Sequence, residues 1–258
     1  SLSGSGQTIW GRLPVISHLA TLSLQAELGH GAMTVIEADP GMGGTALMRH
    51  IGVELAESGR FQILRGDFRQ RAGDISGLRQ AIEDYLYTQG MTRPNVKLAL
   101  QMHLQHFGED SPEELAALLQ FLRPSDEGDA FAERNQNAIF ALFFRVMRRI
   151  ARQRPIYLEL DEFHSDGILA ASFLEYALFE LSFAAFPILI CATITPSEDE
   201  SSLGRAFRAN RSYMGSLLFI HRLPPLEVGI LAEGIHMEYA IDEETAHGLA
   251  RLAGGSPL

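Results

Sequence analysis

The chain has 258 residues, of which 46% are hydrophobic and 21% charged, and its formal net charge is −11 at pH 7. This length fits one large α/β domain, or a core domain with the start of a second, and no apolar run is long enough to span a bilayer. The acidic balance disfavours nucleic acid as a partner of this segment, while a single cysteine, Cys191, excludes an internal disulfide and favours a cytoplasmic location.

The first part of the chain alternates between strand and helix patterns. Residues 1–6 contain only Ser, Leu and Gly and are interpreted as a linker or tag remnant, because they lack the features of a signal peptide. A strand is predicted over Met33–Glu37, and a Pro/Gly-rich turn leads from it into a helix over Thr45–Glu57. A second strand over Phe61–Leu64 and a helix over Ile75–Tyr87 follow. This order is typical of a βαβ unit.

A helical insertion is predicted next, from about Asn95 to Arg154. Ser111 offers an N-cap, and it is followed by a first-turn proline and two glutamates, which all favour a helix start. His103 and His106 show no metal-ligand spacing, so they are interpreted as surface residues of a helix.

Three more strands are predicted beyond the insertion, over Ile156–Leu160, Pro187–Thr193 and Leu217–Leu223, with a helix over Ile168–Phe183. Unbroken apolar strands are typical of a parallel sheet that is buried on both faces. We therefore expect a three-layer α/β core in which the Met33 strand is central, with the Ile156 and Pro187 strands beside it.

The last part of the chain reads as two short helices, over Leu226–Glu238 and Asp242–Ala253. The expected division is a core over 7–224 and a small helical lid over 225–258. The lid is expected to be truncated where the chain stops.

The turn after the first predicted strand has the composition of a phosphate-binding loop. Such loops use glycines so that backbone N–H groups can surround phosphate oxygens, a lysine for the β- and γ-phosphates, and Ser or Thr for Mg²⁺. Thr45 is present, but Ala38 stands where the first glycine belongs and Gly44 where the lysine belongs. A plain glycine-rich turn is the alternative. The candidate nucleotide-binding residues of this loop are Pro40, Gly41, Met42, Gly43, Gly44, Thr45 and Ala46.

Two acids, Asp161 and Glu162, come directly after the Ile156 strand. In a P-loop ATPase the first acid of such a pair holds the Mg²⁺ shell together with the loop's Ser or Thr, and the second orients or deprotonates the attacking water. Two acids after a strand are more often a solvated helix start, but their position after a P-loop-like turn favours the catalytic reading. His164, which follows, is interpreted as a packing or capping residue.

With these motifs the chain resembles the signal-transduction ATPases called STAND, within the AAA+ group of P-loop NTPases of the ASCE type. Residues 9–12, Ile-Trp-Gly-Arg, resemble the segment that lines the adenine pocket in that family, which implies that Gly11 and Arg12 contact nucleotide. The strand over 188–193 resembles the sensor-1 strand, and the resemblance places Thr193 near the γ-phosphate.

The closing residues Gly255, Ser256 and Pro257 resemble the Gly-x-Pro turn of the family's lid, in which the proline contacts the base region. One further residue departs from the family pattern, because Thr195 stands where relatives often carry an arginine. The identity of a trans-acting arginine finger stays open. Its three candidates are more simply interpreted as a solvated helix face: Arg205, Arg208 and Arg211.

The resemblance implies ATP or ADP with Mg²⁺ as ligands, further domains of a longer parent chain, a possible homo-oligomer, and a role in signal transduction or transcription regulation. The missing lysine should weaken nucleotide binding and impair hydrolysis more, because preplaced positive charge stabilises the departing phosphoryl group. Arg49 is interpreted mainly as a solvent-facing helix residue, with a reach back to the phosphates as the alternative. Three hypotheses remain: a regulatory nucleotide-binding module with weak or absent hydrolysis, which we favour, an active ATPase rescued by another basic residue, or a scaffold that binds no nucleotide.

Overall fold

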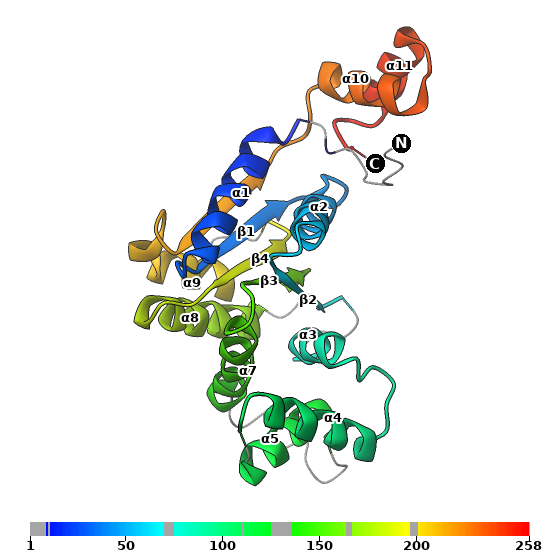
Figure 1. The fold of residues 1–258 in the computed structure, drawn as a ribbon. Helices are drawn as coiled ribbons and strands as arrows, with labels where there is room; N and C mark the ends of the chain where they lie inside the picture. Colours follow the sequence, from blue (N-terminus) through cyan, green and yellow to red (C-terminus); the bar gives the residue numbers. More distant parts are fainter. Residues whose placement is uncertain are drawn as a thin grey trace.

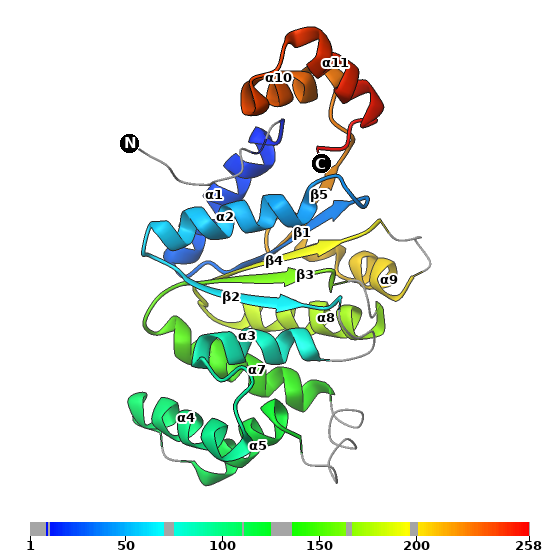
Figure 2. The same cartoon turned by 90° about the vertical axis from the view of Figure 1, so that its right-hand side faces the viewer.

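Five strands form one parallel sheet in the order β2-β3-β4-β1-β5 (Figure 1 and Figure 2). The computed structural model describes residue 9 and residues 11–69, 75–109, 111–124, 136–163, 167–196 and 201–257. The predicted linker over 1–6, Trp10 and His164 lie outside the described residues. The strands are β1 (Ala32–Ala38), β2 (Gln62–Asp67), β3 (Ile156–Asp161), β4 (Ile188–Ile194) and β5 (Leu218–Leu223).

The predicted parallel α/β sheet is confirmed, but its expected strand order is wrong in one respect. β4 pairs with β1, as expected, with Val35 opposite Ala192. β3 does not pair with β1, because β4 lies between them and Leu158 stands opposite Ile190. The central strand is therefore β4, which is buried along its whole length. A uniformly apolar strand is compatible with any interior position, so the sequence pattern did not decide the order.

Helices cover both faces of the sheet and complete the three layers (Figure 2). One face carries α1 (Leu13–Glu27) and α2 (Gly44–Glu57). The opposite face carries α3 (Ser76–Leu86), α7 (Gln136–Ala151), α8 (Gly167–Phe183) and α9 (Ser202–Ala209). The helix α1 was not predicted, although Pro14 in its first turn is a helix-start signal.

Side chains along the strands alternate between two apolar layers, which explains the unbroken apolar runs. In β3, Leu158 and Leu160 pack into the cluster beneath α7 and α8, whereas Tyr157 joins the cluster beneath α1 and α2. Its hydroxyl donates a 3.1 Å hydrogen bond to the Met48 carbonyl of α2. This contact fixes α2 against β3, the strand that ends at Asp161.

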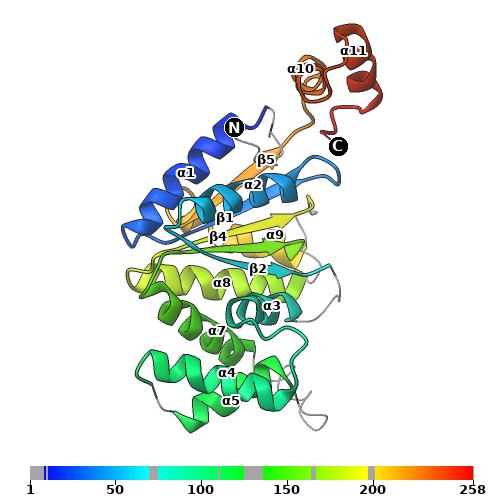
Figure 3. The ribbon, with the colours of Figure 1, turned by 45° about the vertical axis from the view of Figure 1, so that its right-hand side comes forward.

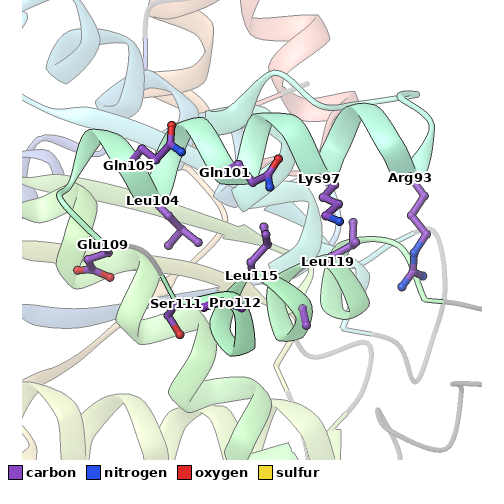
Figure 4. Close-up of a pocket in the computed structure, with 11 residues that line it drawn as sticks. Arg93, Lys97, Gln101, Leu104, Gln105, Glu109, Ser111, Pro112, Leu115 and Leu119 are labelled. Atoms are coloured by element: carbon purple, nitrogen blue, oxygen red, sulfur yellow. The ribbon is translucent and has the colours of Figure 1, made fainter.

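The predicted insertion is helical in its described residues, which form α4 (Arg93–His106), α5 (Pro112–Leu122) and α7. The Ser111 hydroxyl accepts a 3.2 Å hydrogen bond from the Glu114 amide, which confirms the N-cap. A groove of about 400 Å³ runs between α4 and α5, and Figure 4 shows Lys97 and Gln101 along its α4 wall and Leu115 on α5. The insertion thus carries a surface of its own, separate from the ends of the strands.

His103 is a correction to the sequence interpretation. It is 8% exposed, and its ring packs edge-on against Tyr85 and Phe107, so it is a core residue of the insertion rather than a surface residue. Burial, with the nearby Arg149 guanidinium, lowers the pKa of His103 from 6.5 to about 4. His106, about one turn later in the same helix, is exposed as expected. The spacing alone could not separate the two, because the burial of His103 involves a contact with Tyr85 of α3, which is distant in the sequence.

The last described segment forms two helices, α10 (Val228–Tyr239) and α11 (Glu243–Leu252), as the sequence predicts. They project beyond the strand ends and pack on each other (Figure 3). Their apolar contacts form a cluster separate from those of the sheet: Leu226, Leu231, Ala232, Ala246 and Ala250. Within the described residues, no helix combines the length and apolarity needed to cross a membrane.

Candidate functional site

The loop between β1 and α2 has the backbone conformation that its glycines permit. Gly41 and Gly43 both have a φ of 86°, in the left-handed region where a side chain would be strained. Gly43 caps α2, and the Met42 amide donates a 3.0 Å hydrogen bond to the Asp39 carbonyl. The loop therefore turns tightly into the N-terminus of a helix whose first amides and dipole favour an anion.

The two departures from the usual loop sequence, Ala38 and Gly44, face each other. A Cβ built on Gly44 would lie 3.2 Å from the Ala38 Cβ and 3.6 Å from Ile36 Cγ2. The Ala38 methyl therefore crowds the position from which a lysine side chain would start. Pro40 precedes this turn, and Ala46 continues α2 behind it.

Asp161, at the end of β3, is the centre of the polar contacts. The Thr45 hydroxyl donates a 2.8 Å hydrogen bond to Asp161 Oδ1, and the Thr193 hydroxyl donates a 2.7 Å bond to the same oxygen. The Asp161 side chain is only 5% exposed. Three segments far apart in the sequence, α2, β3 and β4, thus meet at one carboxylate.

The donor set fits a magnesium ion. Mg²⁺ in nucleotide sites commonly takes one or two carboxylates, waters and the phosphates of its substrate, so it does not need a dedicated cage. Thr45 and Asp161 supply a hydroxyl and a carboxylate 2.8 Å apart at the N-terminus of α2. The described residues contain no group of three or more His, Cys, Asp or Glu that could hold a metal ion.

Glu162 follows Asp161 in a strained conformation, with a φ of 54°. Its amide donates a 2.9 Å hydrogen bond to the Thr193 hydroxyl, which in turn donates to Asp161. Thr193 therefore links the two acids and fixes the turn between them. A strained backbone conformation persists only where surrounding contacts hold it in place, and such conformations cluster at functional sites.

Gly11 and Arg12 lie between the phosphate loop and the C-terminal helices. Arg12 Nη2 donates a 3.2 Å hydrogen bond to the Met42 carbonyl, and burial lowers the pKa of the guanidinium. Gly11 has a φ of 67°, and a Cβ there would lie 2.7 Å from Leu226 Cδ2. The segment expected to line the adenine pocket is therefore in direct contact with the loop.

Residues after α11 also return to the loop. The Ser256 hydroxyl donates a 2.9 Å hydrogen bond to the Gly41 carbonyl. Pro257 Cγ would lie 3.3 Å from a Cβ on Gly43. The predicted Gly-x-Pro turn is thus brought to the phosphate loop, which its distance in the sequence did not show.

Two arginines that motif analysis undervalued or missed also approach Asp161. Arg49 Nη2 lies 3.3 Å from Asp161 Oδ2, so this side chain points toward the site although it is half exposed. Arg69, two residues beyond β2, lies 3.4 Å from the same oxygen and also pairs with Asp67. The signal for Arg69 was its position just past a strand end, which is informative only once β2 is known to lie beside β3.

The arginine-finger candidates lie on a separate element. Arg205 and Arg208 are exposed on α9, and Arg211 is exposed on the short 3₁₀ helix Arg211–Tyr213. Thr195 directly follows β4. Whether any of the three arginines acts across a subunit boundary stays a prediction.

Comparison with solved structures identifies the fold. The chain aligns over its whole length with Cdc6p from Pyrobaculum aerophilum at a TM-score of 0.57 and 16% identity, covering 59% of that protein. It aligns equally completely with the ADP form of the ORC2 protein of Aeropyrum pernix, at a TM-score of 0.55 and 12% identity, covering 63% of it. The chain has the fold of the AAA+ P-loop ATPases.

The chain thus spans about three fifths of the length of these two AAA+ structures. A STAND protein with a tetratricopeptide repeat sensor from Pyrococcus horikoshii also aligns with the whole chain, at a TM-score of 0.45 and 14% identity, and the chain covers 30% of it. No protein-family model and no curated protein matches the sequence. The likeness is therefore one of fold, and the role of each site residue rests on the geometry above.

Proposed function

We propose that this AAA+ fold is a regulatory module that binds ATP or ADP with Mg²⁺ and hydrolyses ATP weakly or not at all. The observation that carries the proposal is the convergence of Thr45, Thr193 and Asp161 beside a loop with two left-handed glycines. Backbone amides and the helix dipole supply the anion site, and the hydroxyl and carboxylate supply the cation site. Nothing in this arrangement requires the missing lysine for binding alone.

Hydrolysis makes a further demand. As the γ-phosphoryl group leaves, charge spreads over its oxygens, and fixed cations aimed at them lower the barrier. Gly44 contributes no charge at the position where intact loops place a lysine. The site therefore favours retention of the nucleotide over turnover, which suits a switch that responds to which nucleotide is bound.

The proteins of similar fold support the ligands and the domain context that we propose. The Aeropyrum pernix ORC2 protein has been solved in its ADP form and with ADPNP and ADP. The chain covers only part of these proteins, 59% of Cdc6p and 63% of the ORC2 protein. We infer that the module acts together with other domains of a longer chain. More specifically, we propose a STAND-like domain arrangement and assembly into a homo-oligomer.

A second candidate function, a scaffold that binds no nucleotide, is favoured by the contact of Ser256 with the Gly41 carbonyl. This contact and the approach of Pro257 to Gly43 place part of the chain itself against the phosphate loop. In that case the fold would serve protein contacts, with the loop closed permanently.

Calorimetric titration with Mg-ATP and Mg-ADP separates the two candidates, and phosphate release measured on the same samples tests turnover. The proposal expects saturable binding of both nucleotides with little phosphate release. An Asp161→Ala variant is the matched control and should lose the Mg²⁺-dependent part of the affinity. Absence of heat with both nucleotides at millimolar concentration would establish the scaffold instead, and rapid phosphate release would establish an active ATPase.

A further inference from the structure

The two oxygens of Asp161 have different partners. Oδ1 accepts the hydroxyl hydrogen bonds of Thr45 and Thr193, whereas Oδ2 faces the guanidinium groups of Arg49 and Arg69, at 3.3 Å and 3.4 Å. The carboxylate is almost fully buried, while the two arginine side chains are about half exposed, at 52% and 51%. Two half-exposed guanidinium groups therefore face one buried carboxylate.

Arg69 is held in place before any ligand arrives. Its Nε donates to Asp67 Oδ1 and Oδ2 at 3.0 Å, and the pair raises the pKa of the guanidinium further above its ordinary value. Asp67 stands opposite Asp161 in the register of β2 and β3, so the two strand ends carry two acids side by side. Two adjacent carboxylates bind either a guanidinium or a metal ion well. Arg69 and a bound cation would therefore compete for Asp161 Oδ2.

The other arginines near the loop are committed elsewhere. Arg65 Nε donates a 2.9 Å hydrogen bond to the buried Glu159, and Arg12 is buried against the Met42 carbonyl. Arg49 and Arg69 differ because both also face Asp161, the carboxylate that a bound cation would use, although Arg69 pairs with Asp67 as well.

We propose that Arg49 and Arg69 replace the missing lysine: they neutralise Asp161 in the empty site and contact the terminal phosphate of a nucleoside triphosphate when the nucleotide and its cation occupy the site. This inference rests on the proposed nucleotide binding and adds the residues that recognise the third phosphate. An exposed guanidinium on a long side chain can change partner at little cost, and its fork matches phosphate oxygens. The exchange makes triphosphate recognition depend on residues outside the loop itself.

The test is titration of the full chain with Mg-ATP and Mg-ADP, comparing Arg69→Ala, Arg49→Ala and the double variant with the parent. Arg60→Ala is the matched control, because Arg60 lies just before β2, is 54% exposed, and pairs with Glu27 away from the site. We expect each single substitution at Arg49 or Arg69 to weaken Mg-ATP binding about tenfold and Mg-ADP binding much less, since one charge-assisted phosphate contact is lost. Arg69→Lys should recover part of the loss, and Arg60→Ala should bind like the parent.

A purely neutralising role predicts the opposite sign. If Arg49 and Arg69 only balance the charge of Asp161, their removal frees the carboxylate for the cation, and Mg-ATP binding becomes tighter or stays the same. Either result would overturn the inference while leaving the proposed nucleotide binding intact. Equal losses for ATP and ADP would also overturn it, because the third phosphate would not be the group contacted. A parent chain that binds neither nucleotide would overturn both proposals together.

Discussion

The Ala38 methyl lies 3.2 Å from the position that a Cβ on Gly44 would occupy. The two positions at which the loop departs from the phosphate-binding pattern are therefore sterically coupled. Glycine at residue 44 is compatible with alanine at residue 38, and a larger residue at 44 requires the methyl to move by a few tenths of an ångström. This closeness could not be read from the sequence, where the residues are separated by the whole loop.

The coupling predicts that Gly44→Lys needs Ala38→Gly to act fully. The double variant should tighten Mg-ATP binding about tenfold or more, because one charge-assisted contact to phosphate is regained without crowding. Gly44→Lys alone should gain less. Gly44→Met with Ala38→Gly has a similar stem without the charge and serves as the control in calorimetric titration. Identical affinities for the lysine and methionine variants would show that the loop no longer presents phosphate to residue 44.

Thr45→Val should weaken Mg-ATP binding about tenfold. Valine has the shape of threonine but cannot donate the 2.8 Å hydrogen bond to Asp161 or offer an oxygen to the cation. Thr21→Val is the control, since the Thr21 hydroxyl only donates to the Ser17 carbonyl of its own helix. Mg²⁺ titration at fixed ATP gives the readout. A Thr45→Val chain with an unchanged Mg²⁺ requirement would remove Thr45 from the cation site.

The buried His103 predicts a loss of stability in mild acid. Its pKa is about 4 in the folded chain and about 6.5 unfolded, so below pH 6.5 the unfolded chain takes up a proton that the folded chain does not. The free energy of unfolding should therefore be highest above pH 6.5 and fall as the pH approaches 4, by about 2 kcal/mol between pH 7 and pH 5.

His103→Phe isolates this effect because phenylalanine retains ring contacts with Tyr85 and Phe107 but cannot titrate. Urea unfolding of both chains at pH 7 and pH 5 gives the comparison. Other groups that change charge in this range, including Glu109, contribute to both chains and cancel in the difference. The same pH dependence in parent and variant would show that folding does not lower the pKa of His103.

Gly52→Ala should destabilise the fold by about 2 kcal/mol or more, although alanine normally stabilises a helix interior relative to glycine. A methyl at Gly52 would overlap Glu159 Oε1, and the Glu159 side chain is only 3% exposed. Glu159→Ala combined with Gly52→Ala should destabilise less than the sum of the two single changes, because the overlap is removed. Gly248→Ala, in α11 with open space around it, is the control for helix propensity. Additive effects in urea unfolding would contradict a contact between residue 52 and Glu159.

The elements and the central site were predictable where the signal is local. Apolar runs gave the strands to within a few residues, and the strand-loop-helix context marked Thr45 and Asp161 although the loop lacks its lysine. The order of strands, the approach of Arg69 to Asp161 and the return of Ser256 to the loop were not predictable, because each depends on which segments become neighbours. His103 shows the same limit inside a helix, since its burial is decided by the helices that cover it.

The chain has one lysine, Lys97, and the structure places it exposed on the α4 wall of the groove between α4 and α5 (Figure 4). Arginine provides the other side-chain positive charges, and guanidinium groups do not react with amine-directed reagents at neutral pH. Apart from the terminal amine, acylation would therefore attach a label at a single position, on the insertion and away from the loop. A fluorophore placed there would report movements of the insertion without altering a charge at the proposed nucleotide site.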